Sequence, residues 1–133
     1  MYDTRKNTPK SEIDRRLAHL KSQLEENDIA AALFVQRADL LYFSGTIQEA
    51  HLYVPLDDEP ILMVFKNYDR AIAESSLSRI VPLESPRAIP QILRNYGYAI
   101  PQTIGMELDV LPVNLYRNYQ RTFENRHLVD VSH

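Results

Sequence analysis

The sequence predicts an α/β domain with a mixed six-stranded sheet flanked by helices. Short apolar runs alternate along the chain with stretches whose apolar residues recur at helical spacing. Two neighbouring runs are joined by a short Pro-bounded link, which is typical of an antiparallel hairpin. The remaining strand–helix alternation favours parallel pairing, so the sheet is expected to be mixed. The length of 133 residues fits one domain.

The first third of the chain begins with a polar segment, 1–10, which we expect to be a flexible tail; residues 11–133 then form a single domain. The first helix is expected to start at Ser11, with Asp14 as a weak capping-box partner. The wholly apolar run 30–35 predicts a buried strand, and 37–43 predicts a short helix that Gly45 ends.

The rest of the chain supplies the hairpin and three strand–helix units. Asn67 is expected to cap the helix near 68–77. Pro86 or Pro90 is expected in the first turn of the helix near 88–96, and Gly97 just after its end. Pro112 is expected in the first turn of the last helix. The predicted strands are 30–35, 50–54, 61–65, 79–83, 103–108 and 127–131; the later helices lie near 68–77, 88–96 and after Pro112.

Composition excludes several classes of site and partner. The absence of cysteine excludes disulfides, thiolate metal sites and cysteine nucleophiles. The net charge of −3 argues against nucleic acid as a partner, and no apolar run reaches the roughly 20 residues of a membrane helix. The polar N-terminus carries no signal-peptide pattern, so we expect a cytoplasmic protein.

Catalytic motifs are also missing. The three glycines are far apart, so no phosphate loop is present, and the four histidines lack metal-ligand spacing. We therefore expect no catalytic residue and no metal ligand in this chain. Glu107 and Asp109 end a strand where α/β proteins often bind ligands, although helix capping is the simpler role for both.

One polar cluster follows the first strand–helix unit. It could line a site, or it could be a solvated loop around one glycine turn. Its members are Tyr42, Ser44, Gly45, Thr46, Gln48 and His51.

The same segment carries a family resemblance. Five segments of the chain carry it: the strand 30–35, the run Asp39-Leu-Leu-Tyr-Phe-Ser-Gly45, Leu62-Met-Val64, Ile104-Gly-Met-Glu107 and Leu128-Val-Asp-Val131. Together they resemble the N-terminal domain of the creatinase, prolidase and aminopeptidase P family. The match covers about residues 12 to 131. Thr46 departs from it, since the family often has an aromatic residue there.

The resemblance implies a fold and a function. The fold is a six-stranded mixed sheet with a ribonuclease H-like outline. The function is that of a non-catalytic domain of an Xaa-Pro dipeptidase or aminopeptidase, which forms a homodimer and covers the partner's active site, admitting short proline-containing peptides. The resemblance further implies a catalytic metallopeptidase domain after His133, carrying two divalent metal ions. The six residues of the polar cluster would then gate the substrate.

Two other functions stay open. The domain could serve only oligomerisation, with Tyr53, Tyr96, Tyr98, Tyr116 and Tyr119 as candidates for an exposed face, although core packing is the simpler role for Tyr116 and Tyr119. It could instead be a small stand-alone hydrolase that uses His51 with Asp39 or Ser44.

Overall fold

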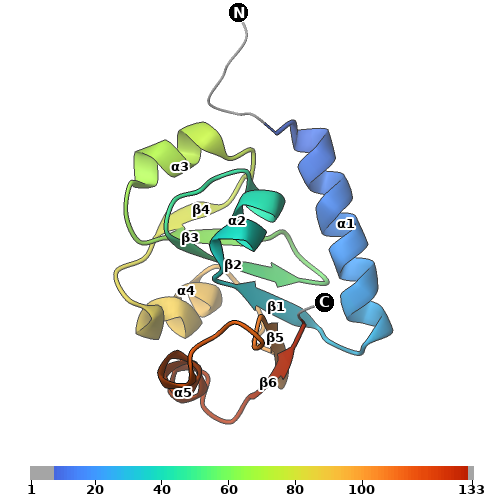
Figure 1. Cartoon of the computed structure of the whole chain (residues 1–133), viewed down its shortest axis with the longest axis vertical. Helices are drawn as coiled ribbons and strands as arrows, with labels where there is room; N and C mark the ends of the chain where they lie inside the picture. Colours follow the sequence, from blue (N-terminus) through green and yellow to red (C-terminus); the bar gives the residue numbers. More distant parts are fainter. Residues whose placement is uncertain (1–7, 132–133) are drawn as a thin grey trace, which may run out of the picture.

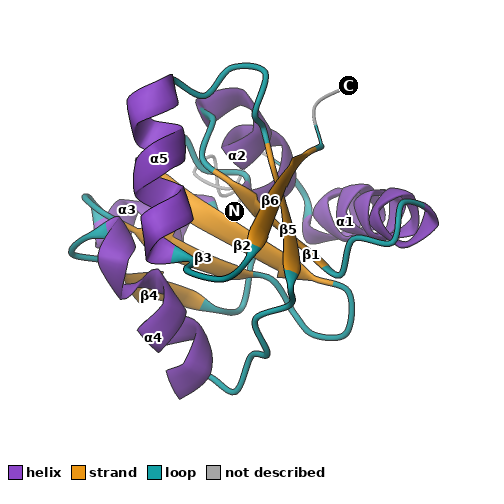
Figure 2. Ribbon diagram, turned by 90° about the horizontal axis from the view of Figure 1, so that it is seen from below, coloured by secondary structure: helices purple, strands orange, loops and turns teal. Residues whose placement is uncertain are grey.

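A computed structural model describes residues 8–131 as a six-stranded sheet between two layers of helices (Figures 1 and 2). The predicted tail, 1–10, lies mostly outside the described residues. The elements, in chain order, are α1 (Lys10–Glu26), β1 (Ala31–Phe34), α2 (Arg37–Ser44), β2 (Ala50–Pro55), β3 (Ile61–Val64), α3 (Tyr68–Glu74), β4 (Ile80–Pro82), the 3₁₀ turn η1 (Pro86–Ala88), α4 (Ile89–Asn95), β5 (Thr103–Met106), α5 (Val113–Thr122) and β6 (His127–Asp130).

The strand order is β4-β3-β2-β1-β5-β6. β2 is antiparallel to both of its neighbours, whereas β3–β4, β1–β5 and β5–β6 pair in parallel. The mixed six-stranded α/β sheet predicted from the sequence is therefore confirmed. Because β2 alone runs in the opposite direction, it begins at the edge where the other five strands end. We call this the carboxyl edge of the sheet.

Each face of the sheet carries its own apolar core, because side chains alternate along every strand. Ala32 and Phe34 face α1 and α2, whereas Ala31 and Leu33 face α4 and α5. Figure 2 shows the sheet lying between α1 on one side and the α4–α5 pair on the other. The central strands are therefore buried on both faces, which explains why they are continuous apolar runs.

Two predicted helix starts are off by one residue, and a third start is correct but lacks the expected side-chain cap bond. α1 begins at Lys10 with Pro9 at the N-cap position, so Ser11 lies inside the helix. Asn67 does occupy the N-cap of α3, but in a left-handed conformation and without a side-chain cap bond. Pro112 is the N-cap of α5 and not its first residue. The fixed φ of proline suits both entry positions, so the backbone and not a side chain sets where these helices begin.

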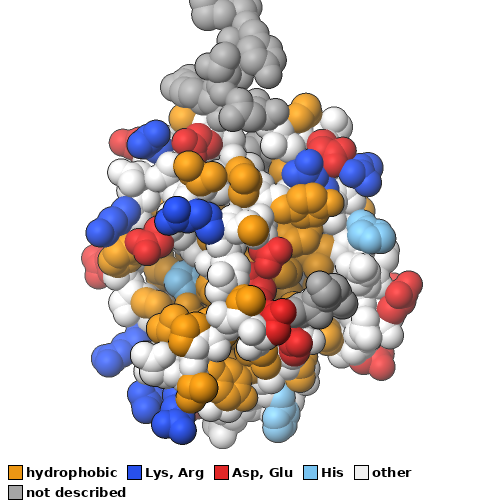
Figure 3. Space-filling view, in the orientation of Figure 1, with side chains coloured by type: hydrophobic (Ala, Val, Ile, Leu, Met, Phe, Trp, Pro, Cys, Tyr) orange, Lys and Arg blue, Asp and Glu red, His pale blue; other side chains and the backbone are white. Residues whose placement is uncertain are grey.

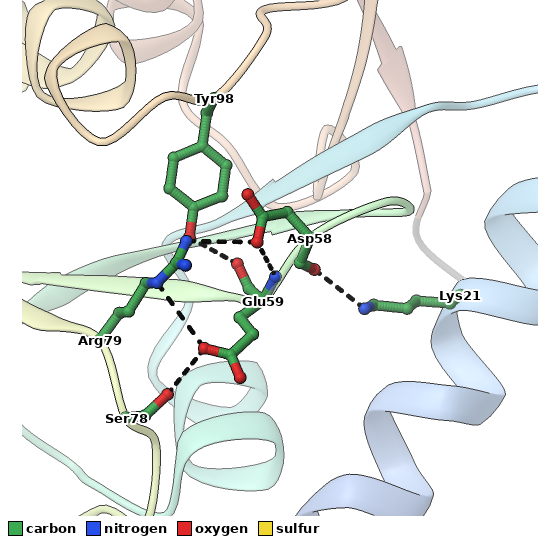
Figure 4. A network of polar contacts seen from close by, with 6 residues as sticks. All are labelled: Lys21, Asp58, Glu59, Ser78, Arg79 and Tyr98. Atoms are coloured by element: carbon green, nitrogen blue, oxygen red, sulfur yellow. Dashed lines mark hydrogen bonds and ion pairs between the residues drawn. The ribbon is translucent and has the colours of Figure 1, made fainter.

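A polar network fixes the opposite edge of the sheet, at the β2–β3 hairpin (Figure 4). Arg79 donates to the Tyr98 hydroxyl at 2.7 Å and to Asp58 at 3.3 Å, and Tyr98 donates to the Glu59 carbonyl at 2.6 Å. From α1, Lys21 donates to the Asp58 carbonyl at 3.0 Å. A cavity of about 600 Å³ opens beside this hairpin, between it and α1. These contacts satisfy the loop's polar groups within the protein.

Candidate functional site

The polar cluster Tyr42–His51 lies at the carboxyl edge, between the end of α2 and the start of β2. Gly45 ends α2 with φ at +84°, a left-handed conformation in which a side chain would be strained. The left-handed stop that the sequence predicts at this glycine is confirmed.

Three of the cluster's polar side chains point into the protein. Ser44 and Thr46 are fully buried and Gln48 is nearly so. Thr46 donates to Glu74 Oε1 at 2.6 Å, and the Gln48 amide donates to the same carboxylate at 3.1 Å. The Ser75 hydroxyl donates to the Ser44 carbonyl at 2.5 Å. The segment is therefore tied to the C-terminal end of α3.

Glu74 receives these bonds as a carboxylate. Partial burial disfavours its charged form, but hydrogen bonds from Thr46 and Gln48, the Arg70 charge and a hydrogen bond from the Ile47 backbone together lower its pKa. Glu74 was not identified from the sequence, because it lies 28 residues from Thr46 and nothing local marks the pairing.

Replacing Glu74 with alanine should lower the free energy of unfolding by about 1–3 kcal/mol, because the buried Thr46 and Gln48 side chains would lose their acceptor. Urea denaturation measures this change. Glu26→Ala, an exposed change at the end of α1, is the matched control and should cost under about 0.5 kcal/mol. Equal effects of the two substitutions would show that the network does not stabilise the segment.

Tyr42 faces outward instead. Its side chain is 47% exposed, and the Arg16 guanidinium lies 4.2 Å from the ring centre. Arg16 also donates to the Tyr42 carbonyl at 2.9 Å, which holds α2 against α1. Next along the cluster, Ile47 is 52% exposed. Tyr42, Ile47 and Glu49 are thus the exposed side chains of this segment, and Tyr42 and Ile47 are the large apolar ones.

His51 lies on the other face of the sheet, under α5. Its Nε2 is 2.6 Å from the Tyr119 hydroxyl, and its Nδ1 is buried without a hydrogen-bond partner. Burial lowers the pKa of His51 to about 4, so the ring is neutral at physiological pH. The structure therefore separates His51 from the Ser44–Gln48 network.

The stand-alone hydrolase hypothesis needs a nucleophile, a base and an acid in contact. Ser44 donates to the Leu40 carbonyl, His51 contacts Tyr119, and Asp39 lies beside Glu107. Each side chain has a different partner, so these residues do not form a catalytic triad.

Glu107 is the most perturbed carboxyl group near the carboxyl edge. It is 3% exposed and accepts hydrogen bonds from the Val35 and Gln36 amides, both at 2.9 Å. Burial, together with the nearby Asp39 carboxyl, raises the pKa of Glu107 to about 7 against the effect of these two amides. Glu107 and Asp39 line a cavity of about 380 Å³.

Glu107 accepts backbone amides, but not those of the helix that follows it in the sequence. Its two amide donors belong to the start of α2, whereas the N-cap of α5 makes no side-chain cap bond. Asp109 does not occupy the N-cap position expected for it, because Pro112 is the N-cap of α5. Within residues 8–131, no group of three or more His, Cys, Asp or Glu residues could hold a metal ion.

Exposed apolar side chains gather at the carboxyl edge. They follow the ends of β3 and β5 or flank the α2–β2 segment, and comprise Leu41, Ile47, Phe65, Val110 and Val113. The tyrosines proposed for an oligomerisation face do not contribute in this way. Tyr53, Tyr98 and Tyr119 are buried, Tyr116 is half-buried against the core, and Tyr96 is 50% exposed at the end of α4.

Comparison with known families places the chain. The family model described as the creatinase/prolidase N-terminal domain matches residues 16–133. The chain belongs to this family. No curated protein matches the sequence significantly.

Solved structures of Xaa-Pro peptidases share the fold. A proline dipeptidase from Streptococcus agalactiae is 20% identical with a TM-score of 0.72, over 89% of this chain and 93% of that one. An X-Pro aminopeptidase from Thermotoga maritima is 19% identical with a TM-score of 0.74, over 87% of this chain and 33% of that one. Prolidase from Pyrococcus furiosus is 24% identical with a TM-score of 0.71, over 86% of this chain and 35% of that one. The matched region thus makes up about a third of the Thermotoga aminopeptidase chain and of the Pyrococcus prolidase chain.

Proposed function

We propose that this chain is the non-catalytic N-terminal domain of a cytoplasmic Xaa-Pro peptidase. The observation that carries the proposal is the family match over residues 16–133, together with relatives in which this fold makes up about a third of a peptidase chain. Catalysis would come from a C-terminal domain holding two divalent metal ions, which would activate water and polarise the peptide carbonyl. No helix among residues 8–131 is both long and apolar enough to cross a membrane.

The carboxyl edge is the surface proposed to meet the catalytic domain, either of the same chain or of the second subunit of a homodimer. Its exposed side chains Leu41, Ile47, Phe65, Val110 and Val113 would lose contact with water on docking. A domain held over an active site excludes water and limits the length of peptide that can enter. Short proline-containing peptides would then be the substrates.

Within the α2–β2 segment, we assign two kinds of role. Gly45 and the bonds from Ser44, Thr46 and Gln48 hold the path of the backbone. Tyr42 and Ile47 are exposed and would face the peptide or the opposing domain. His51 contacts Tyr119 of α5 on the other face of the sheet, so its effect on substrate would be indirect.

The test uses a protein in which this chain precedes an Xaa-Pro peptidase catalytic domain. Ile47→Ser should change KM for an Xaa-Pro dipeptide by about threefold or more with a smaller change in kcat, because it alters access and binding but not the chemistry. Tyr96→Ser is the matched control, since Tyr96 is 50% exposed against 52% for Ile47 but lies at the end of α4.

Two outcomes would contradict the proposal. If Ile47→Ser and Tyr96→Ser both leave KM and kcat unchanged, the α2–β2 segment does not gate substrate. Sedimentation of the same variants separates gating from assembly: a dimer that dissociates with unchanged kinetics would leave oligomerisation as the domain's function.

A further inference from the structure

Arginine side chains gather between α4 and α5, on the sheet face opposite α1. Two adjoining cavities, of about 450 and 520 Å³, open there. Arg94 and Arg126 line the first, Arg121 lines the second, and Arg87 lines both. Figure 3 shows basic side chains at the lower left, over the helices that Figure 1 places there, with no acidic side chain visible beside them.

The arginines that the structure describes fall into two groups: three form ion pairs with carboxylates, and the four that line these cavities, like Arg37, Arg70 and Arg117, do not. Arg15, Arg16 and Arg79 form ion pairs with carboxylates. Among residues 8–131, no such ion pair involves any of the four groove arginines, and Glu124 is the one carboxylate that lines either cavity. In a chain with a net charge of −3, this groove is a local concentration of uncompensated positive charge.

Most of the donor groups in the groove are unused. Arg121 donates once to Asn118, at 3.0 Å, and Arg126 donates once to the Ile100 carbonyl, at 3.3 Å. A guanidinium carries five N–H donors, so each retains several. The lining also includes hydroxyl and amide side chains, namely Ser85, Gln91, Asn118, Thr122 and Asn125, and the apolar residues Pro86, Pro90, Ile100 and Phe123.

We propose that this groove binds an anion carrying two or more phosphate groups. Guanidinium groups bind phosphate oxygens through paired, charge-assisted hydrogen bonds. Arg87, shared by the two cavities, would contact both phosphates, with Arg121 on one and Arg94 and Arg126 on the other. The lining has no exposed aromatic side chain on which a base could stack, which disfavours a single-stranded nucleic acid.

This site is separate from the surface used in the proposed function. It lies between α4 and α5, whereas the proposed peptidase role rests on the α2–β2 segment at the carboxyl edge. Phosphate binding can therefore be measured on this chain alone, and the result does not depend on peptidase kinetics.

The test is calorimetric titration of the 133-residue chain with sodium tripolyphosphate, without metal ions and at low ionic strength. We expect saturable one-to-one binding that weakens as salt is added. Arg87→Gln should weaken it about tenfold or more. Arg117→Gln is the matched control, because it removes the same charge from α5 but lines neither cavity, and its effect should stay within about twofold. Circular dichroism checks that both variants remain folded.

Two further ligands identify the source of the phosphates and the class of anion. A peptide with two phosphoserines that binds more tightly than tripolyphosphate would assign the groove to a phosphorylated protein segment, and the reverse order to a free oligophosphate. The proposal is overturned if no saturable binding occurs, if Arg87→Gln and Arg117→Gln weaken binding equally, or if hexaglutamate binds as tightly as tripolyphosphate.

Discussion

Alanine in place of Gly105 should lower the free energy of unfolding by about 1–3 kcal/mol, the usual cost of overpacking a core. Gly105 lies in β5 between Ala32 of β1 and Val129 of β6. A Cβ atom there would lie 2.4 Å from Val131 Cγ1 and 3.5 Å from Ile29 Cγ2. Val131 resists displacement, because its amide donates to the Met106 carbonyl at 2.9 Å and a β-branched side chain is stiff at χ1.

A second substitution shows whether this contact is the cause. Val131→Ala removes the atom that the new Cβ would meet, so the double variant should be more stable than the sum of the two single changes predicts. Chemical denaturation of the four proteins gives the coupling free energy. Additive effects, or a Gly105→Ala protein as stable as the original, would show that β6 accommodates the methyl group.

Removal of the Glu107 carboxyl group should have an effect at least as large. Glu107→Ala leaves the amides of Val35 and Gln36 without their acceptor at the entrance to α2, and we expect a loss of about 2–4 kcal/mol. Glu107→Gln retains one acceptor oxygen and should cost less. Equal losses for the two variants would mean that packing, and not hydrogen bonding, accounts for the effect.

Glu107 should also make stability depend on pH. Its pKa is raised to about 7 in the folded protein against 4.5 for an ordinary glutamate. The folded state therefore holds a proton that the unfolded state has released, and this contribution is full below about pH 4.5 and lost as the pH rises to about 7. Asp39→Asn removes a neighbouring carboxylate, so it should lower the pKa of Glu107 and raise stability at pH 8 by about 1 kcal/mol.

Denaturation curves from pH 4 to 8, with carboxyl-carbon NMR of Glu107, measure both effects. His51 acts in the opposite direction, since its lowered pKa costs stability as the pH falls from about 6.5 toward 4. Glu107→Gln should abolish the decline in stability between pH 4.5 and 7 while leaving the His51 effect. A decline that persists in Glu107→Gln would place its origin elsewhere.

The helices and strands could be predicted from the sequence, because a buried core requires apolar residues at the spacing that each type of element sets. Buried strands such as Ala31–Phe34 must be apolar throughout, and α1 must carry apolar residues at spacings of three and four. Gly45 was predictable as a helix stop because few residues other than glycine adopt its backbone conformation readily. These features depend on local chemistry and can therefore be read from neighbouring residues.

The polar contacts were much less predictable. The Glu107 carboxylate accepts a hydrogen bond from the Val35 amide, 72 residues away in the sequence, and Glu74 accepts one from Thr46, 28 residues away. Only the strand order brings such groups together, and hydrophobic periodicity does not determine it. For the same reason the Ser44–Gln48 segment looked like an exposed polar loop from its composition, although Glu74 and Ser75 draw three of its polar groups inward.

Hydrolysis of Xaa-Pro dipeptides by this 133-residue chain alone tests the central claim most directly. The assay would include Mn²⁺, Co²⁺ or Zn²⁺ in turn, with a complete Xaa-Pro dipeptidase as the positive control. A non-catalytic domain should give no turnover above buffer with any metal. Turnover that scales with the concentration of the chain and is lost in Ser44→Ala or His51→Ala would contradict the proposed role.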